Sequence, residues 1–307
     1  MPEESRSGGS AVILLTGATG AVGSYLLPML LERGERVKCL VRQPDKLGRH
    51  RVDVQMVMGD LKELSDPFML RQSLRGVDCV IHLAGSLRDQ PGHPVEELNG
   101  LATVRLVEGA EIVGANRFLY FGALGASPVQ ETRFLRSKWT GQAAVEGSDL
   151  ESTVFRPSIV FDRSDPWVTL MERFSFLPFM PVAGSGKSEY QPVWAKNAAE
   201  AVIASLDLGA DAPGTIELAG PETLTYAAMS ALVAEMAGRP RPVRTLPLPL
   251  VRAGLDLLKA AVGPNVFATS QEAELMQVSM TSPEGDRDLR ELGISPSTMA
   301  QVLTGQV

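Results

Sequence analysis

The chain has 307 residues, 44% of them hydrophobic, which is enough to bury the core of one large domain or two modest ones. The formal net charge is −7 and the acidic and basic residues are interspersed, so nucleic acid is not expected as a partner. No apolar run is as long as a membrane-spanning helix, and we expect no transmembrane segment.

The chain begins with a polar stretch, residues 1–10, which is rich in glycine and serine and predicts a flexible tail with no signal peptide. The two cysteines, Cys39 and Cys79, fall in apolar runs typical of buried strands, where a free thiol behaves as a small hydrophobic group. Their spacing indicates neither a disulfide nor a metal site, which is typical of a cytoplasmic protein.

An apolar run at residues 12–15 leads directly into a glycine-rich turn, residues 16–23, and then into apolar residues at helical spacing. This strand, turn and helix are typical of a dinucleotide-binding site, in which backbone N–H groups at the helix N-terminus hold the pyrophosphate. A tight turn without a ligand is the alternative for the glycines taken alone. The cofactor-binding residues predicted here are Gly17, Thr19, Gly20, Ala21, Val22 and Gly23.

A second apolar strand, residues 37–41, ends in Arg42. An acidic residue at this position would bind the ribose hydroxyls of NAD, whereas an arginine suits the 2′-phosphate of NADP. We therefore expect NADP(H) to be preferred over NAD(H), with Lys46 as a second cation. The alternative for Arg42 is an ordinary solvated charge after a strand.

The next two strands, residues 54–58 and 79–83, end in segments that we also assign to the cofactor. Asp60, followed by Leu61, is placed to accept a hydrogen bond from the adenine amino group, and its alternative role is a helix N-cap. Ala84 and Gly85 are small residues, at which the backbone can pass close to a phosphate or a ribose.

Two polar residues near the fourth strand have structural and functional interpretations. His82 lies within the strand, where a hydrogen-bonded core histidine is favoured over a catalytic one. Asn99 falls in a helical pattern over residues 95–113 and either orders the active site or lies on the polar face of the helix.

A fifth strand at residues 117–121, a helix at 133–146 and a sixth strand at 152–155 continue the alternation. Regular alternation predicts an α/β Rossmann fold, a doubly wound parallel sheet whose ligand lies outside the carboxyl ends of the strands. We assign residues 11–160 to this NAD(P)-binding domain.

From residue 161 the chain is richer in proline and loops, and we predict a smaller C-terminal α+β substrate lobe. The lobe is assigned residues 161–194 and 213–307, with a helix over 195–212 returning to the Rossmann domain. The apolar residues over 246–262 suit a hydrophobic ligand or a membrane surface, but a helix packed on the core of the lobe is favoured.

Taken together, the motifs resemble the extended short-chain dehydrogenase/reductase superfamily, and specifically its atypical branch of NDUFA9-like complex I accessory subunits. The resemblance covers nearly the whole chain. It is carried by residues 16–23, 40–42, 59–61, 81–85, 123–126, 135–138, 156–158 and 191–193.

In active members of the superfamily, a Tyr-x-x-x-Lys pair transfers the proton and a serine after the fifth strand binds the substrate oxygen. The resemblance implies that Lys138 is the lysine, that Phe134 stands where the tyrosine should be, and that Gly122 stands at or beside the serine position. Lys138 would then only bind the cofactor ribose, with a solvated helix lysine as its alternative. Pro157 and Ser158 are expected beside the cofactor.

Two functions remain open from the sequence. One is an NAD(P)H-binding protein with little or no catalysis, associated peripherally with a membrane or with a protein complex. The other is an NADPH-dependent oxidoreductase or isomerase acting on a small or quinone-like or lipid-like hydrophobic substrate. In that case Tyr120, Ser158 or Tyr190 would donate the proton.

Overall fold

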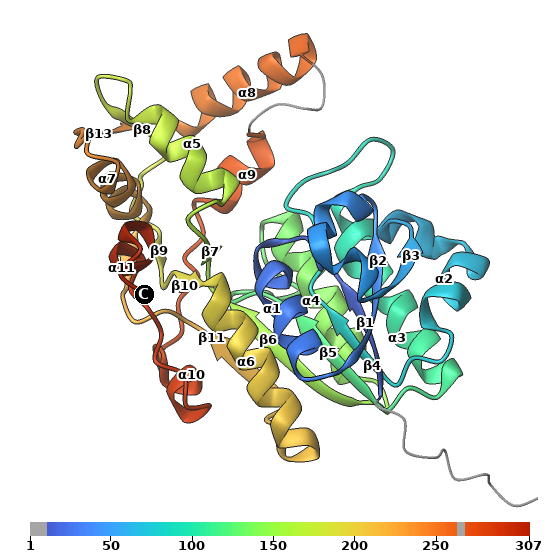
Figure 1. Cartoon of the computed structure of the whole chain (residues 1–307). Coiled ribbons are helices and arrows are strands. Elements are labelled where there is room, and N and C mark those ends of the chain that lie inside the picture. The colour runs from blue at the N-terminus through green and yellow to red at the C-terminus, as the bar shows by residue number, and fades with distance from the viewer. Residues whose placement is uncertain (1–10, 263–267) are drawn as a thin grey trace, which may run out of the picture.

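A parallel sheet lies at the centre of the computed structural model, which describes residues 11–262 and 268–307 (Figure 1). The predicted tail, residues 1–10, lies outside the described residues. In the described chain the sheet has seven strands in the order β11-β6-β5-β4-β1-β2-β3. The predicted doubly wound Rossmann fold is confirmed. Its strands are β1 (Val12–Thr16), β2 (Arg36–Val41), β3 (Gln55–Met58), β4 (Cys79–His82), β5 (Arg117–Phe121), β6 (Glu151–Pro157) and β11 (Thr215–Leu218).

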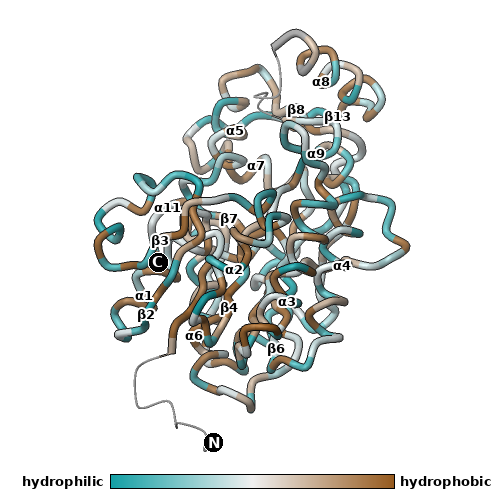
Figure 2. The backbone as a smooth tube through the Cα atoms, turned by 90° about the vertical axis from the view of Figure 1, so that its right-hand side faces the viewer, coloured by the Kyte–Doolittle hydropathy of each residue, from teal (hydrophilic) through white to brown (hydrophobic). Residues whose placement is uncertain are grey.

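Helices cover both faces of this sheet. Successive residues of a central strand point to opposite faces, and because both sets are apolar, both faces must be buried. In β1, Ile13 and Leu15 belong to one core, and Val12 and Leu14 belong to the other. Figure 2 shows the hydrophobic strands enclosed in the interior. One face is covered by α1 (Ala21–Glu32) and α6 (Ala195–Leu208), and the other by α2 (Pro67–Leu74), α3 (Ala102–Val113) and α4 (Arg133–Glu146).

Short helical turns connect several of these elements, and one of them replaces part of a predicted helix. The helical pattern over residues 95–113 forms α3 preceded by a π-helical turn, η3 (Glu97–Leu101), which contains Asn99. The other turns are η1 (Pro44–Val52), η2 (Leu61–Ser65) and η4 (Gly209–Asp211).

The edge strand β11 pairs in parallel with β6, with Thr215 opposite Val154. The sequence analysis assigned these residues to the smaller lobe, but in the structure they extend the main sheet. The reason is that the preceding helix, α6, packs on α1 and returns the chain to the edge of the sheet.

The rest of the chain after residue 160 forms the smaller lobe, which continues the core on the α1 side of the sheet (Figure 1). Three pairs of short strands, β7 with β10, β8 with β13 and β9 with β12, join its helices. Its elements are β7 (Val160–Phe161), α5 (Pro166–Phe174), β8 (Met180–Ala183), β9 (Glu189–Tyr190), β10 (Val193–Trp194), β12 (Leu224–Thr225), α7 (Tyr226–Met236), β13 (Val243–Leu246), α8 (Leu248–Val262), α9 (Ser270–Leu275), α10 (Arg287–Glu291) and α11 (Met299–Thr304).

Helix α8 is an exception to this packing. None of its described side chains, residues 248–258 and 260, is buried, and Leu250 and Leu257 are 70% and 73% exposed. The favoured prediction, a helix packed on the core of the lobe, is therefore wrong: α8 packs against α9, and its described side chains stay outside the core.

We predict that Leu14→Ala lowers the free energy of unfolding by about 2–5 kcal/mol, because the truncation leaves a cavity in the sheet core where Leu14 is fully buried. Ile112→Ala on α3 is the matched control, since Ile112 is 85% exposed and its truncation costs less than about 0.5 kcal/mol. Urea denaturation measures both, and equal losses would contradict the packing described.

Candidate functional site

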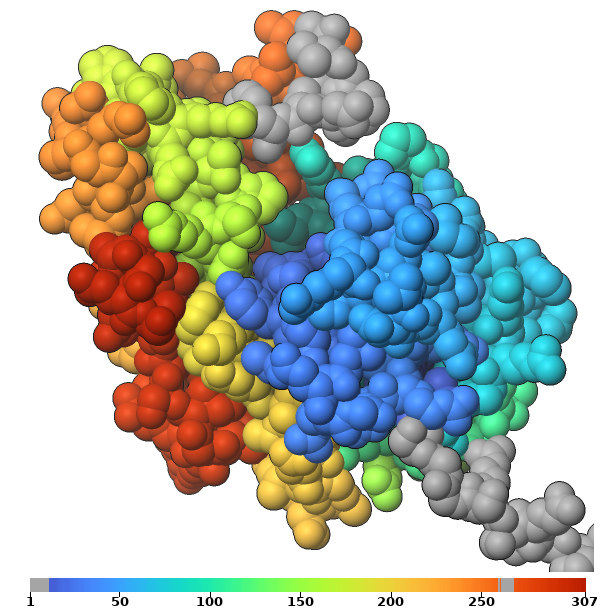
Figure 3. Space-filling view, viewed as in Figure 1, coloured from blue at the N-terminus to red at the C-terminus, as the bar shows by residue number. Residues whose placement is uncertain are grey.

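Two adjoining cavities, of about 280 Å³ and 350 Å³, form a groove at the carboxyl ends of the parallel strands. They share the wall residues Gly17, Gly20, Leu83, Gly85 and Ser86, so one extended molecule can occupy both. The space-filling view shows the molecule hollowed between the Rossmann domain and the smaller lobe (Figure 3). This is the position at which doubly wound sheets bind dinucleotides.

The glycine turn between β1 and α1 packs closely against the backbone at the end of β4. Gly17 has φ +78°, and a Cβ added there would lie 2.8 Å from the backbone nitrogen of Ala84. A Cβ at Gly23 would lie 2.1 Å from the carbonyl oxygen of Gly17, so only glycine lets α1 start against the turn. Gly20 is the N-cap of α1 and supplies no side-chain cap, which leaves the first N–H groups of the helix available to an anion.

All the predicted cofactor residues line one or both cavities. The first cavity is lined by Gly17, Thr19, Gly20, Arg42, Asp60, Leu61, Ala84 and Gly85, and the second by Gly17, Gly20, Ala21, Val22, Gly23, Gly85, Lys138, Pro157 and Ser158. The open helix terminus and the close-packed glycines fit a pyrophosphate, and the two adjoining cavities can take the two halves of a dinucleotide.

Arg42 and Asp60 form the polar end of the first cavity. The Arg42 side chain is 59% exposed, and its Nη1 lies 3.5 Å from Oδ2 of Asp60 and 3.3 Å from Oε1 of Gln90. These long contacts leave the guanidinium free to bind another anion. Lys46 lines the same cavity.

Asp60 caps a helical turn, which was its alternative role, and it also lines the first cavity. Its Oδ1 accepts a hydrogen bond of 2.6 Å from the N–H of Leu61, which makes it the N-cap of η2. Its side chain also lines the first cavity. The carboxylate that caps η2 is therefore also available to a ligand at the carboxyl end of β3.

Lys138 lies at the base of the second cavity with 6% of its surface exposed, so the alternative of a solvated helix lysine is wrong. Its Nζ donates a 2.7 Å hydrogen bond to the carbonyl oxygen of Phe121 and lies 5.2 Å from the ring centroid of Tyr120. Burial lowers the pKa of this amine to about 8. A Cβ at Gly85 would come within 3.1 Å of Nζ, so Gly85 makes room for the lysine head group.

Phe134 lies one turn before Lys138 on α4, and both side chains line the second cavity together with Gly122. The positions that the resemblance assigned to the acid and to the substrate-binding hydroxyl are therefore in the cavity wall, and they carry a phenyl ring and a hydrogen atom. Neither group can donate a proton.

The chain has four tyrosines, all among the described residues, and of these only Tyr190 lines the second cavity. Tyr120 is fully buried and donates its hydroxyl to the carbonyl oxygen of Lys138 at 3.2 Å, so it is not placed to serve a substrate. The hydroxyl of Tyr190 has no hydrogen-bond partner among the described residues. Burial and the neighbouring Tyr226 raise the pKa of Tyr190, which the side chain of Ser188 only partly offsets, so this phenol is a poor acid.

Ser158, the remaining proposed donor, also lines this cavity. Its Oγ donates a 2.6 Å hydrogen bond to the carbonyl oxygen of Met280 and accepts one of 3.0 Å from the N–H of Gln191. Both bonds tie the hydroxyl to the smaller lobe, which gives Ser158 a structural role at the junction.

Asn99 is buried and does not lie on a polar helix face, so that alternative is wrong. Its side chain binds both the N–H of Ser86, at 2.7 Å, and the carbonyl oxygen of Ser86, at 2.8 Å, and so fixes the loop that walls both cavities. The π-helical turn η3 places Asn99 there, and such turns are frequent at functional sites.

His82 is a core histidine, as favoured from the sequence. Its two ring nitrogens lie 2.6 Å from Oγ1 of Thr16 and 3.1 Å from Oγ1 of Thr103, and the side chain is fully buried. Burial lowers its pKa to about 3, so the ring is neutral.

The structure adds residues that the sequence analysis did not assign to the site. Asp165, Trp167, Leu275, Met276 and Met280 come from the smaller lobe and line the second cavity. No local motif marks these residues, because each reaches the cavity only when the lobe folds back over the sheet. Burial raises the pKa of the Asp165 carboxyl.

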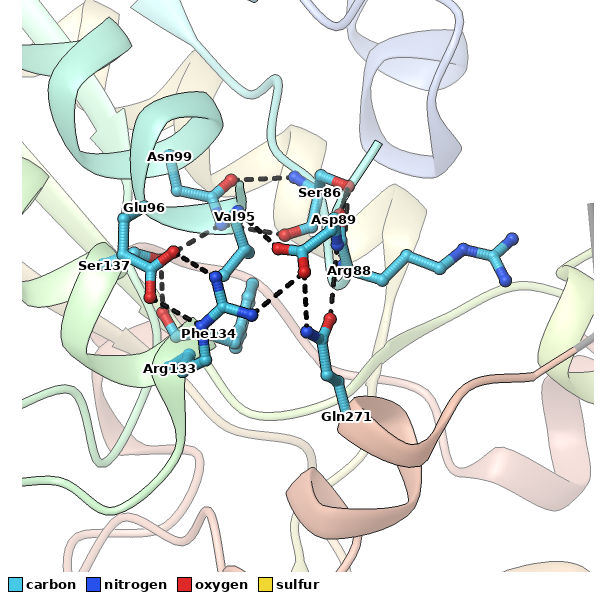
Figure 4. A network of polar contacts seen from close by, with 10 residues as sticks. All are labelled: Ser86, Arg88, Asp89, Val95, Glu96, Asn99, Arg133, Phe134, Ser137 and Gln271. Carbon is cyan, nitrogen blue, oxygen red and sulfur yellow. Dashed lines mark hydrogen bonds and ion pairs between the residues drawn. The ribbon is translucent and has the colours of Figure 1, made fainter. Parts of the chain in front are cut away.

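A polar network joins the loop after β4 to α4 and α9 (Figure 4). Asp89, in the loop after β4, accepts hydrogen bonds of 3.0 Å from Arg133 on α4 and 2.9 Å from Gln271 on α9. Arg133 also binds Glu96 through Nε at 2.7 Å. The network therefore fixes α9, and with it the wall residues Leu275 and Met276, to the Rossmann domain.

A sequence model described as NAD(P)H-binding matches residues 17–173, about half of the chain. The chain belongs to this NAD(P)H-binding family. The matched segment contains the glycine turn, Arg42, Lys138 and Ser158, which are the residues that surround the groove.

Relatives with known names bear out the resemblance found in the sequence. The mitochondrial NADH dehydrogenase [ubiquinone] 1 alpha subcomplex subunit 9 of Arabidopsis thaliana is 29% identical over 79% of this chain and 62% of that protein, so the chain spans less than two thirds of that relative. Sterol demethylase protein B of Methylococcus capsulatus is 25% identical over 93% and 94% of the two chains, and ceramide reductase of Caulobacter vibrioides is 27% identical over 88% and 86%.

Solved structures confirm the fold. The crystal structure of gox2253 superposes with a TM-score of 0.70 at 22% identity over 96% of both chains. The Thermus thermophilus UDP-glucose 4-epimerase complex with NAD has a TM-score of 0.69 at 19% identity over 95% of this chain and 96% of that one. At these identities the likeness shows an extended short-chain dehydrogenase/reductase fold and nothing finer.

Two further features of the described residues bear on the kind of site present. No group of histidine, cysteine, aspartate or glutamate side chains in the described chain gathers in a way that could hold a metal ion. Within residues 11–262 and 268–307, no helix is both long and apolar enough to cross a membrane.

We predict that the stability of the protein rises with pH through the titration of Lys138. Because the pKa of Lys138 is about 8 when folded and 10.5 when exposed, the unfolded chain binds more protons between these values, and unfolding becomes harder as pH rises. Relative to Lys138→Met, the free energy of unfolding should increase by about 2 kcal/mol from about pH 7 to about pH 9.5. Urea denaturation of the unaltered protein and of Lys138→Met at both pH values measures this difference. The prediction is contradicted if the free energy of unfolding changes by the same amount in both proteins.

Proposed function

We propose that this protein binds NADP(H) at the groove and catalyses carbonyl reduction by the superfamily's usual route weakly or not at all. The observation that carries the proposal is the pair Phe134 and Lys138, which line one cavity with the lysine kept and the phenol missing. A bound reduced nicotinamide supplies a hydride. Loss of a general acid typically lowers a rate by about 10²–10⁴-fold.

The roles of the residues follow from what each can donate or accept. The N–H groups at the start of α1 hold the pyrophosphate, and Lys138 donates to the ribose of the nicotinamide half. Asp60 accepts from the adenine, and Arg42 with Lys46 binds the 2′-phosphate. Preference for NADP(H) is supported by the exposed guanidinium of Arg42, whose contacts to Asp60 and Gln90 are long.

We predict that Arg42→Ala weakens NADPH binding by about 10-fold to 100-fold, because a charge-assisted hydrogen bond to the 2′-phosphate is lost. NADH binding should change little. Arg36→Ala is the matched control, since Arg36 is an exposed arginine at the opposite end of the same strand, β2. Fluorescence titration with each cofactor measures both variants. Equal affinity of the unaltered protein for NADH and NADPH would contradict the proposed preference.

A second candidate function is an oxidoreductase or isomerase acting on a hydrophobic, lipid-like molecule. The second cavity supports it, because its wall includes Leu87, Val160, Leu275, Met276 and Met280 around the single unpaired hydroxyl of Tyr190. Two relatives carry the names sterol demethylase protein B and ceramide reductase, which refer to lipid substrates of those proteins.

Association with a protein complex is supported by relatives named as subunits of NADH dehydrogenase.

We predict that Phe134→Tyr combined with Gly122→Ser creates NADPH-dependent reductase activity, at least about 10²-fold above the unaltered protein. The serine is accommodated because the nearest atoms to a Cβ at Gly122 are 3.4 Å away. NADPH oxidation with panels of aldehydes, ketones and quinones measures the gain, and Phe134→Leu with Gly122→Ser is the control.

The same assay separates the two candidate functions. Steady turnover by the unaltered protein would overturn the proposal of weak or absent catalysis and support the oxidoreductase. Intact NADPH binding with no gain in the double variant would indicate that the cavity does not accept these substrates in a reactive position.

A further inference from the structure

Helix α8 carries an apolar surface that the rest of the described chain does not cover. At about 100° per residue, its side chains form three stripes. Leu248, Val251, Leu255 and Leu258 are half-buried and form the stripe toward α9. Leu250, Ala253, Gly254 and Leu257 are all exposed and form a second stripe, about 130° around the helix.

Arg252 and Asp256 lie on the third stripe, away from the exposed leucines. Arg252 is on this side and binds Glu274 on α9 at 2.9 Å, which keeps the helix from rotating on its support. Asp256 follows one turn later on the same side. The exposed apolar stripe therefore has no charged residue within it, as in helices that lie in a membrane interface.

Further exposed apolar side chains flank β8 and β13, which lie at the same end of the molecule as α8 (Figure 2). Phe176 is 68% exposed and its ring stacks against the guanidinium of Arg239, with 4.0 Å from the guanidinium carbon to the ring centroid. Leu177 is 42% exposed, and its carbonyl oxygen accepts a 2.9 Å hydrogen bond from Arg241. Aromatic and basic side chains side by side are typical of contact with lipid head groups.

The charge of this segment is opposite to that of the whole chain. Residues 236–262 contain one anion, Asp256, and five cations, whereas the chain has a net charge of −7. The cations are Arg239, Arg241, Arg244, Arg252 and Lys259. A local excess of positive charge in the segment that carries the apolar stripe complements an anionic lipid surface.

The size of the stripe argues against a second copy of the chain as its cover. A stable dimer needs about 800 Å² of buried surface on each partner. Two leucines with an alanine and a glycine between them supply only part of that area. A lipid surface requires no matching protein surface, because it admits the leucines individually and adds attraction to the arginines.

We propose that α8 docks this protein on an anionic lipid surface, with Phe176 and Leu177 at the same end of the molecule. The inference goes beyond the proposed function and does not depend on catalysis. Helix α8 packs on α9, whose Leu275 lines the second cavity. Docking would therefore place the wall of the apolar cavity close to the lipid, where a hydrophobic ligand could enter it.

The test uses the full chain and vesicles of phosphatidylcholine, with or without phosphatidylglycerol, in a co-sedimentation assay. The unaltered protein is expected to bind the anionic vesicles, less so at high salt, and to bind pure phosphatidylcholine weakly. Leu250→Glu with Leu257→Glu should reduce binding by about tenfold or more, because two carboxylates cannot enter the interface.

The matched control is Val52→Glu with Ile112→Glu, which adds the same charge at two exposed positions of the Rossmann domain. This control should bind vesicles nearly as the unaltered protein does, and NADPH titration should show that both double variants are folded. Equal loss of binding in the two variants would overturn the proposal, as would no binding by the unaltered protein. A dimer in light scattering that Leu250→Glu with Leu257→Glu abolishes would assign the stripe to a second copy instead.

Discussion

The close approach of the β1–α1 turn to the end of β4 is the constraint on which the rest of the site depends. Gly17 sits against the backbone of Ala84, and Gly23 sits against the carbonyl oxygen of Gly17. Glycine at both positions lets α1 begin directly at the edge of the sheet. The first N–H groups of α1 have no side-chain cap, because the N-cap residue is Gly20. The same contact brings the ends of β1 and β4 together, and the two cavities meet there.

In the second cavity, a buried lysine lies in a wall that also contains Phe134 and Gly122. Lys138 remains buried, bonded to a backbone carbonyl, with no carboxylate among its hydrogen-bond partners. Burial without an anionic partner disfavours the charged form of this amine, and the pKa of Lys138 is lowered for that reason. Phe134 and Gly122 preserve the packing beside it without supplying a proton.

The smaller lobe completes the groove through contacts that cross between the two parts of the chain. Asp89 joins Arg133 on α4 to Gln271 on α9, and Ser158 joins β6 to the segment around Met280. These bonds hold the apolar wall of the second cavity in place. Helix α9, which lines the second cavity through Leu275, also packs against α8. The wall of the cavity is therefore joined directly to the exposed apolar stripe of α8.

The sequence by itself determined the parallel sheet, the cofactor turn and the missing phenol. These features are local: apolar runs, glycine spacing and a residue one turn before Lys138 can be seen in a single segment. Only the tertiary structure decided that β11 joins the main sheet, that Asn99 holds Ser86, and that Tyr190, Asp165 and Met276 reach the cavity. It also decided that α8 stays uncovered, because an amphipathic pattern specifies an apolar face but not what will pack against it.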